Sequence, residues 1–477
     1  MDRSLLYINK DHIVNKYFIL IILSTLLFSS CSNYDKNKKP NIVLINIDDL
    51  GWKDLEYMGS DFYETPNIDL LSKQGMIFTN GYASASNCAP SRASLLTGRW
   101  TPRHGIYTVA SSERGESKNR KLIPIENTTT LSNGHIILSE ILKNNGYATG
   151  HAGKWHLSNK PLLRGFDANI GGSHAGHPTS YYPPYGNVDL EVKNDEYLTD
   201  LIMAKAIQFI KSTEQPFLLY YAPYAVHTPI QPVDSLIYKY EDKSTKNGQK
   251  NIKYASMIDN LDRNIGLLIS TLNDLGIIDN TFIVLTSDNG GLFGITDQSP
   301  LRAGKGSYYE GGIRVPFAFV WKGEIPTNNN SDIPITNLDL FPTLLDVAKI
   351  NSSGYEFDGE SILPILKGEK ISEPRPLFWH FPIYLEASSY GNNSQNRDPL
   401  FRTRPGSVVR FGDWKLHHYF EDDGIELYNL KEDIGEKRNL VNDYPKKVEE
   451  LLTLLNNWRK EVNAPVPSLL NPDYELK

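Results

Sequence analysis

Cysteine is almost absent from this chain, which has only two among its 477 residues. Cys31 ends an apolar N-terminal run, and Cys88 is the only cysteine in the body of the chain. A single thiol cannot form an internal disulfide, so a disulfide framework is excluded. Because thiols of exported proteins are usually paired, an isolated Cys88 is unusual for a purely structural residue of an exported protein.

An excess of positive charge is also missing. The 49 lysines and arginines are outnumbered by 56 aspartates and glutamates, which gives a formal net charge of −7. With no stripe of basic residues either, the sequence argues against a nucleic-acid partner. An anionic substrate would therefore have to bind at a local cluster of cations.

Long apolar runs are few, and one of them covers residues 17–28 behind a basic flank. Its length predicts a secretory signal and not a membrane span. The following Ser29-Ser30-Cys31 is typical of a bacterial lipoprotein signal, in which Cys31 is lipidated; a plain signal peptide and an uncleaved anchor helix are alternatives. We expect a signal at 1–31, a polar tether at 32–39, and an exported protein of a Gram-negative bacterium, periplasmic or anchored to the outer membrane.

Buried-strand patterns alternate with helical patterns over most of the chain. The strand patterns are continuous apolar runs, as expected for strands buried on both faces, and several helical patterns end at glycine. The alternation predicts an α/β fold with helices on both sides of a mostly parallel sheet. Strand patterns lie at residues 41–49, 147–156, 216–227 and 281–291, and helical patterns at 130–146, 197–212 and 254–276.

The pattern changes near Arg375, where shorter amphipathic strands begin. A helical pattern over 444–462 follows them. We predict a smaller antiparallel sheet with a terminal helix, and divide the chain into a main domain, 40–370, and a C-terminal subdomain, 371–477.

Acidic and amide side chains follow two of the predicted strands. Asp48 and Asp49 come after the first, and Asp288 and Asn289 come after the run at 281–287. Ligands of open α/β sheets bind at the carboxyl ends of strands, so these side chains can converge. Four hard oxygen ligands suit Ca²⁺ or Mg²⁺ and not Zn²⁺. Each pair alone is equally compatible with capping of a turn or helix.

Cationic groups are found near other strand ends. Lys154 and His156 are two residues apart and so share one face of a strand, while His227 follows another strand. Lys305 lies in a glycine-rich loop where backbone and cation can both approach an anion. The alternative for Lys154 and His156 is that they are simply exposed at the surface. The alternative for the loop with Lys305 is a flexible turn without a binding role.

Cys88 precedes a predicted helix that begins at Pro90 and stops at Gly98. The helix N-terminus favours an anion, and Arg92 lies one turn along. From the residues alone, Cys88 is interpreted as a thiol nucleophile of low pKa that faces an anionic substrate.

The segment from Cys88 to Arg99, CAPSRASLLTGR, resembles the signature of the type I sulfatases of the alkaline-phosphatase superfamily. The resemblance runs from about Pro40 to Leu440, and the chain looks like a bacterial glycan sulfatase similar to arylsulfatase A-type enzymes. It implies that 40–370 is a catalytic domain of a sulfuric ester hydrolase. Other matching segments are NIDDLG, GYATGHAGKWHL, YAVHTP, SDNGG and PLRAGKGSYYEGGIRVP.

The resemblance also changes the interpretation of Cys88. In this family a maturase oxidises the signature cysteine to Cα-formylglycine, whose hydrate attacks sulfur with one hydroxyl. The second hydroxyl then allows sulfate to be expelled and the aldehyde to be regenerated. The maturase is therefore an expected partner. Arg92 would stabilise the hydrated aldehyde.

The remaining roles are also implied by the resemblance. Lys154 and Lys305 would bind sulfate oxygens. His227 would be the general acid for the leaving oxygen, a role that Lys305 could share. His156 would be the base for collapse of the hemiacetal. Asp288 would in addition accept the proton of the attacking hydroxyl. Calcium, with magnesium as the less expected ion, would be held by Asp48, Asp49, Asp288 and Asn289.

The expected substrate is a sulfated carbohydrate, with preference for galactose or N-acetylgalactosamine sugars of glycosaminoglycans or algal galactans. For the aromatic Trp379, core packing is the alternative to a sugar contact. Two other functions compete: a phosphate or phosphonate ester hydrolase of the same superfamily, and a non-catalytic glycan-binding relative. Candidate sugar contacts are His174, His177, Trp379, His380 and Arg402.

Overall fold

The structure of the protein is a computed structural model that describes residues 38–475 apart from 159, 193–194, 215, 246–247, 370–373 and 391–392. The predicted signal at 1–31, all but the end of the predicted tether, and the predicted domain boundary lie outside the described residues. The described residues from Lys39 onward form one compact unit. Within the described part, every helix is too short or too polar to cross a bilayer.

The central sheet has eight strands in the order β5-β4-β6-β1-β7-β8-β2-β9. The strands from β5 to β7 are parallel, and β8 alone runs antiparallel to its neighbours. The predicted mostly parallel sheet is thus confirmed. The strands are β1 (Asn41–Ile47), β2 (Met76–Phe78), β4 (Ala148–Gly153), β5 (Ala168–Ile170), β6 (Phe217–Ala222), β7 (Thr281–Ser287), β8 (Phe317–Val320) and β9 (Asn329–Ser331).

Alternate side chains of each central strand enter two separate cores. In β1, Val43 and Ile45 pack into one core, and Ile42 and Leu44 pack into the other. This two-sided burial explains the continuous apolar runs of the sequence.

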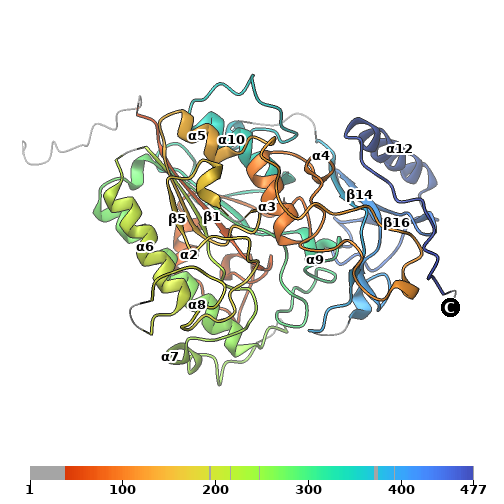
Figure 1. Cartoon of the computed structure of the whole chain (residues 1–477), viewed down its shortest axis with the longest axis horizontal. Coiled ribbons are helices and arrows are strands. Elements are labelled where there is room, and N and C mark those ends of the chain that lie inside the picture. The colour runs from red at the N-terminus through yellow and green to blue at the C-terminus, as the bar shows by residue number, and fades with distance from the viewer. Residues whose placement is uncertain are drawn as a thin grey trace, which may run out of the picture. The chain divides into compact units, whose positions relative to one another are not determined.

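Helices cover both faces of the sheet (Figure 1). One core is closed by α2 (Pro66–Ser72), α6 (Leu198–Ser212) and α8 (Ile252–Asp274). The other is closed by α3 (Cys88–Thr97), α5 (Leu138–Asn144) and α10 (Leu340–Val347). Shorter elements are α4 (Thr101–His104), α7 (Asp234–Ile237), α9 (Glu310–Ile313), α11 (Leu363–Leu366), β3 (Gly81–Tyr82), β10 (Ile335–Thr336), η1 (Glu56–Met58), η2 (Ser117–Asn119), η3 (Pro161–Arg164), η4 (Ile278–Asn280), η5 (Asn337–Asp339) and η6 (Asn393–Gln395).

Two predicted helix starts differ from the structure. The helix expected from residue 130 begins only at Leu138, because the hydroxyl of Ser132 accepts from the amide of Gly134 and organises a turn before it. The helix expected from Pro90 begins at Cys88, which is therefore its first residue and not a flanking one.

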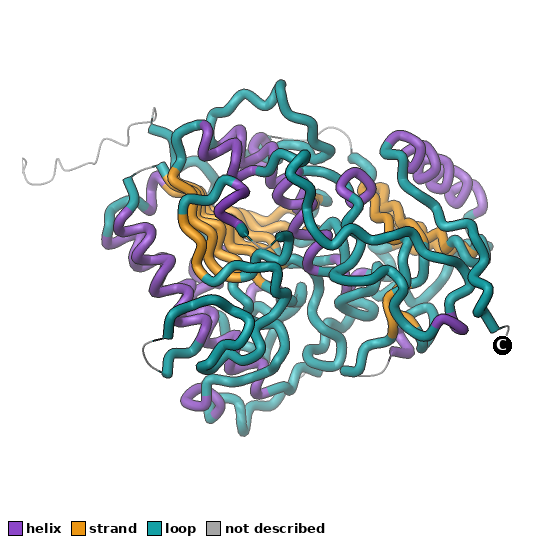
Figure 2. Tube along the Cα trace, viewed as in Figure 1, coloured by secondary structure: helices purple, strands orange, loops and turns teal. Residues whose placement is uncertain are grey.

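The C-terminal part forms a second sheet, seen as a separate group of strands in Figure 2. On it packs α12 (Pro445–Glu461), through Leu451, Leu455 and Trp458, which share one helix face. This confirms the predicted antiparallel sheet and terminal helix. The sheet consists of β11 (Leu377–Phe381), β14 (Gly406–Phe411), β15 (Trp414–Tyr419) and β16 (Gly424–Asn429). A separate antiparallel ribbon is formed by β12 (Leu385–Glu386) and β13 (Phe401–Thr403).

Candidate active site

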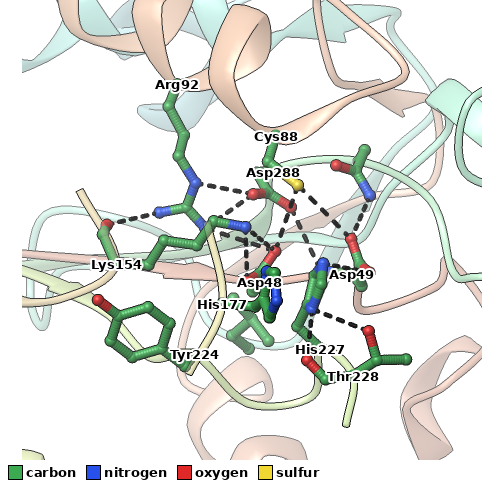
Figure 3. Close-up of polar contacts among 12 residues, drawn as sticks. Asp48, Asp49, Cys88, Arg92, Lys154, His177, Tyr224, His227, Thr228 and Asp288 are labelled. Atoms are coloured by element: carbon green, nitrogen blue, oxygen red, sulfur yellow. Dashed lines mark hydrogen bonds and ion pairs between the residues drawn. The ribbon is translucent and has the colours of Figure 1, made fainter. Parts of the chain in front are cut away.

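The acidic residues that follow β1 and β7 meet at one edge of the sheet (Figure 3). These strands are parallel neighbours, so their carboxyl ends deliver Asp48, Asp49, Asp288 and Asn289 side by side. The amide N–H of Asp49 donates to Asp288 Oδ1 at 3.2 Å, and Asn289 Nδ2 donates to Asp49 Oδ1 at 2.8 Å. The structure thus brings together the four predicted metal ligands, and all four are buried.

The donor set of this cluster fits an oxygen-preferring cation. It offers three carboxylates and one amide carbonyl, the ligands that calcium and magnesium prefer. Although Asn289 is fully buried, its Oδ1 accepts no hydrogen bond from the described residues. Buried polar atoms are usually satisfied, so this oxygen is available to a ligand. Atoms of Asp48, Asp49, Cys88 and His227 also lie within 4.8 Å of one another.

Each buried carboxylate has a cation beside it. Lys154 Nζ lies 2.7 Å from an oxygen of Asp48, and Lys305 Nζ lies 2.7 Å from an oxygen of Asp49. Arg92 Nε donates to Asp288 at 2.8 Å. Three negative and three positive groups can therefore be buried together, because each charge has a partner.

These neighbours set the pKa values of the two aspartates in opposite directions. Burial raises the pKa of Asp48 to about 7, and the attraction of Lys154 offsets that rise only in part. Burial also raises the pKa of Asp49, but Lys305 and His227 outweigh it and hold the pKa below its usual range.

Cys88 lies at the start of α3 and points into this cluster. Its Sγ is 3.6 Å from Asp48 Oδ1 and 3.9 Å from Asp49 Oδ1. Burial raises the pKa of the thiol to about 12, although Lys154 and Lys305 lower it. The prediction of a low-pKa thiol is therefore wrong, because desolvation outweighs the helix terminus and the cations. An unmodified Cys88 is protonated at neutral pH and is a poor nucleophile.

Arg92 is fixed one turn below Cys88. Its Nη1 donates to the carbonyl oxygen of Lys154 at 2.9 Å, and its Nη2 lies 2.7 Å from Asp288. One buried guanidinium thus ties α3 to the segments that follow β4 and β7.

His227 presents one ring nitrogen to the cluster. Its Nδ1 donates to the carbonyl oxygen of Thr228 at 2.7 Å, which leaves Nε2 facing Asp49 Oδ2 at 3.6 Å. The ring of His177 stacks on it, with centroids 5.6 Å apart and planes 15° apart. Burial, followed by the charge of Lys305, lowers the pKa of His227 well below the usual range.

His156 also lines the pocket. Its backbone has a φ of 63°, and its ring meets that of His174 edge to face, 6.0 Å between centroids. Burial and the charge of Lys154 lower its pKa well below the usual range. Its Nδ1 is buried and has no hydrogen-bond partner in the described part of the chain.

A pocket of about 590 Å³ opens above this cluster. Six residues predicted from the sequence line it, namely Cys88, His156, His177, His227, Lys305 and Arg402.

Sequence reasoning missed several polar residues of the pocket wall, among them Arg114, Glu386 and Tyr390. Arg114 Nε donates to both carboxylate oxygens of Glu386, at 2.8 and 3.1 Å. They come from loops and strand ends without a motif, and only the folded chain brings them together, so the sequence carried no signal for them.

Two predicted sugar contacts lie elsewhere. Trp379 and His380 are each 1% exposed. Trp379 Nε1 donates to the carbonyl oxygen of Ala83, and His380 contacts Ser407 through Nδ1 and the carbonyl oxygen of Pro465 through Nε2. Their burial contradicts the prediction that they contact a sugar, because neighbouring polar groups and the core already occupy them.

The chain is similar to known proteins over nearly its whole described length. Residues 40–350 match the sulfatase family, and residues 304–463 match the N-sulphoglucosamine sulphohydrolase C-terminal family. A sulfatase of Formosa agariphila is 32% identical over 93% of each chain. N-acetylgalactosamine-6-sulfatase of Sus scrofa is 33% identical over 74% of this chain and 70% of its own.

A solved structure is similar as well. The crystal structure of Ps i-CgsB in complex with k-i-k-neocarrahexaose has a TM-score of 0.73 and 30% identity, and the match covers 91% of this chain and 95% of that one. The extent of these matches and the assembled site agree with one another: the chain belongs to the sulfatase family and is a sulfuric ester hydrolase.

Proposed function

We propose that this protein removes sulfate from a sulfated carbohydrate after oxidation of Cys88 to Cα-formylglycine. The observation that carries the proposal is the position of Cys88, at the start of α3 and at the floor of a pocket ringed by paired charges. The hydrated aldehyde supplies the attacking hydroxyl. A thiol whose pKa is raised to about 12 would be a poor substitute for it.

The chain's own residues then bind the ester and move protons. Lys154 and Lys305 hold sulfate oxygens, and Arg92, one helical turn from Cys88, stabilises the hydrated aldehyde. His227 Nε2 faces the site; because Nδ1 donates to Thr228, the ring donates from Nε2 to the leaving oxygen only in its doubly protonated form, and Lys305 shares this role as general acid. His156 serves as the base that restores the aldehyde. Asp288 accepts the proton of the attacking hydroxyl.

Calcium, with magnesium second, is the metal that we propose for Asp48, Asp49, Asp288 and Asn289. The all-oxygen donor set and the unpaired Oδ1 of Asn289 support it. A bound divalent cation would polarise a sulfate oxygen.

The sugar that we propose is of the galactose or N-acetylgalactosamine type, from a glycosaminoglycan or an algal galactan. One similar relative is named N-acetylgalactosamine-6-sulfatase, and one similar structure was solved with a neocarrahexaose. His177 lines the pocket and stacks on His227, where it can contact the sugar, and the ring of His174 meets that of His156, which also lines the pocket.

Export is part of the proposal, and it rests on the sequence of residues 1–31. We propose that Cys31 is lipidated, that the protein acts in the periplasm or at the outer membrane, and that the maturase acts on Cys88 before or during export. Incorporation of labelled palmitate into the wild type and its loss in Cys31→Ala would test the anchor. An unlabelled wild type would contradict it.

The experiment for the activity is a screen for sulfate release. Protein produced with a maturase is incubated with galactose and N-acetylgalactosamine sulfated at each position in turn. We expect release from at least one of them by the wild type and none by Cys88→Ala. A Cys88→Ala protein with full activity, or activity on phosphate or phosphonate esters alone, would overturn the proposal.

A further inference from the structure

One cation in the wall of the pocket has no anionic partner among the residues that the structure describes. Arg402 lies in the middle of β13 and lines the pocket together with Cys88, His227 and Lys305. In contrast to Lys154, Lys305 and Arg92, it forms no ion pair with any described residue. Its partners are backbone oxygens: Nε donates to the carbonyl of Glu386 at 3.0 Å, and Nη1 lies 3.5 Å from the carbonyl of Lys305.

Glu386 lies near Arg402, but its carboxylate is already paired with another arginine. The side chain of Glu386 is held in a two-pronged ion pair by Arg114, so these two charges neutralise each other. Arg114, Glu386 and Arg402 together therefore leave one positive charge at the pocket wall. Burial lowers the pKa of Arg402, but arginine remains protonated at neutral pH.

The position of Arg402 is fixed by the loop that carries Lys305. Gly306 has a φ of +89°, and a Cβ there would lie 3.2 Å from Nη1 of Arg402 and 2.7 Å from Leu385. Glycine thus lets the guanidinium lie against the loop backbone. The neighbouring Thr403 donates its hydroxyl proton to the carbonyl of Gly306, which joins the ribbon of β12 and β13 to the same loop.

We propose that Arg402 binds a second anionic group of the substrate, a sulfate or a carboxylate on the same sugar or on its neighbour. The guanidinium lies against the backbone of Lys305, whose side chain is proposed to hold the scissile sulfate. A sulfate and a carboxylate each present two oxygens that can accept hydrogen bonds from the forked N–H donors of the Arg402 guanidinium. The inference rests on the proposed function, because Lys305 defines where the first sulfate is held.

The test compares three saccharides on one galactose-type scaffold. The first carries a single sulfate, the second carries an additional sulfate, and the third carries one sulfate next to a uronate carboxylate. For each, kcat/KM is measured with the wild type, Arg402→Gln, Arg402→Lys and the control Arg438→Gln. Arg438 is an exposed arginine paired with Asp443 at the surface.

We expect the wild type to prefer at least one doubly charged saccharide over the singly charged one. Arg402→Gln should reduce that preference about 10- to 100-fold, as expected when a charged hydrogen-bond partner is lost. Arg402→Lys keeps the charge but not the fork, so it should retain part of the preference. Arg438→Gln should keep all of it. Whichever arm shows the effect, sulfate or carboxylate, identifies the second group.

A wild type without preference for either doubly charged saccharide would overturn the inference. So would a folded Arg402→Gln variant whose preference is unchanged in both arms. If thermal unfolding shows that Arg402→Gln does not fold, the Arg402→Lys variant provides the test. An Arg402→Lys protein with the full wild-type preference for the doubly charged saccharide would contradict a role for the forked guanidinium. The three saccharides carry their first sulfate at a position that the wild type hydrolyses; absence of release from galactose and N-acetylgalactosamine sulfated at every position would instead refute the proposed function itself.

Discussion

At the scale of single residues, Arg92 connects the proposed chemistry of the site to the stability of the fold through its contacts. It is fully buried, as is its partner Asp288, and it also donates to the backbone of Lys154. The side chain therefore supports the cluster in addition to its proposed role beside Cys88.

Replacement of Arg92 by alanine should lower the free energy of unfolding by about 3–5 kcal/mol, because it leaves a buried carboxylate without its partner. Arg99→Ala is the matched control. Arg99 lies just after the same helix, α3, and pairs with the exposed Glu356, so this ion pair should contribute less than about 1 kcal/mol. Urea denaturation measures both, and equal losses would contradict the account.

At the scale of elements, the end of β7 approaches α9 so closely that only glycine fits. A Cβ on Gly290 would lie 1.9 Å from the carbonyl oxygen of Gly311, which is backbone and cannot move aside easily. The close approach holds Asn289 in the cluster.

Gly290→Ala should therefore destabilise the protein by roughly 1–3 kcal/mol and reduce sulfate release, because β7 and α9 must separate. Gly354→Ala is the control, since a Cβ there meets nothing within 4 Å. Thermal unfolding and the sulfate assay report the two effects. A Gly290→Ala protein as stable and as active as Gly354→Ala would refute this explanation.

The C-terminal sheet is fastened to α9 by a buried charge cluster. Lys415 Nζ of β15 lies 2.9 Å from Glu310 and 2.9 Å from Glu436, and all three side chains are fully buried. Burial and the neighbouring Glu310 raise the pKa of Glu436 to about 7, although Lys415 lowers it. For Glu310, Lys415 and Arg314 outweigh burial and lower the pKa to about 2.

These shifts predict opposite effects on stability in two pH windows. Glu436 has a folded pKa above its ordinary value of 4.5, so its stabilisation is complete below pH 4.5 and is lost as the pH rises through about 7. Glu310 contributes above pH 4.5 and loses its contribution as the pH falls toward 2. Between pH 5 and 7, the stability of the wild type relative to Glu436→Gln should decline, as followed by urea denaturation. A constant difference would contradict the assignment.

At the scale of the whole molecule, the C-terminal part completes the catalytic part. Trp458 of α12 stacks on Phe378 with centroids 4.7 Å apart, and it meets Trp100, just beyond the signature, at 5.9 Å. Leu385, Glu386 and Arg402 of the ribbon form part of the pocket wall.

Trp458→Ala should therefore lower the free energy of unfolding by about 3–5 kcal/mol, as expected for loss of a large buried aromatic side chain. Lys446→Ala, on the exposed side of the same helix, should change it by less than about 0.5 kcal/mol. Denaturation followed by fluorescence and by circular dichroism should give one coincident transition in both proteins. A small loss in Trp458→Ala would mean that α12 packs only loosely.

The sequence predicted the catalytic cluster better than the wall of its pocket, for a physical reason. Residues such as Asp48 and Asp288 follow buried strands whose parallel pairing brings their ends together. Arg114 and Glu386 meet only because the ribbon and a loop pack in tertiary structure. Trp379 was misplaced because an aromatic strand pattern does not tell which face is covered.

The central claim, that Cys88 is a precursor and not a thiol nucleophile, is tested most directly by mass spectrometry of the Cys88 peptide. The peptide would be taken from protein made with a maturase, and sulfate release would be assayed in the same sample. We predict the mass of the formylglycine form, with activity proportional to its fraction. A peptide that carries only the unmodified thiol, in a sample that releases sulfate at full rate, would contradict the account.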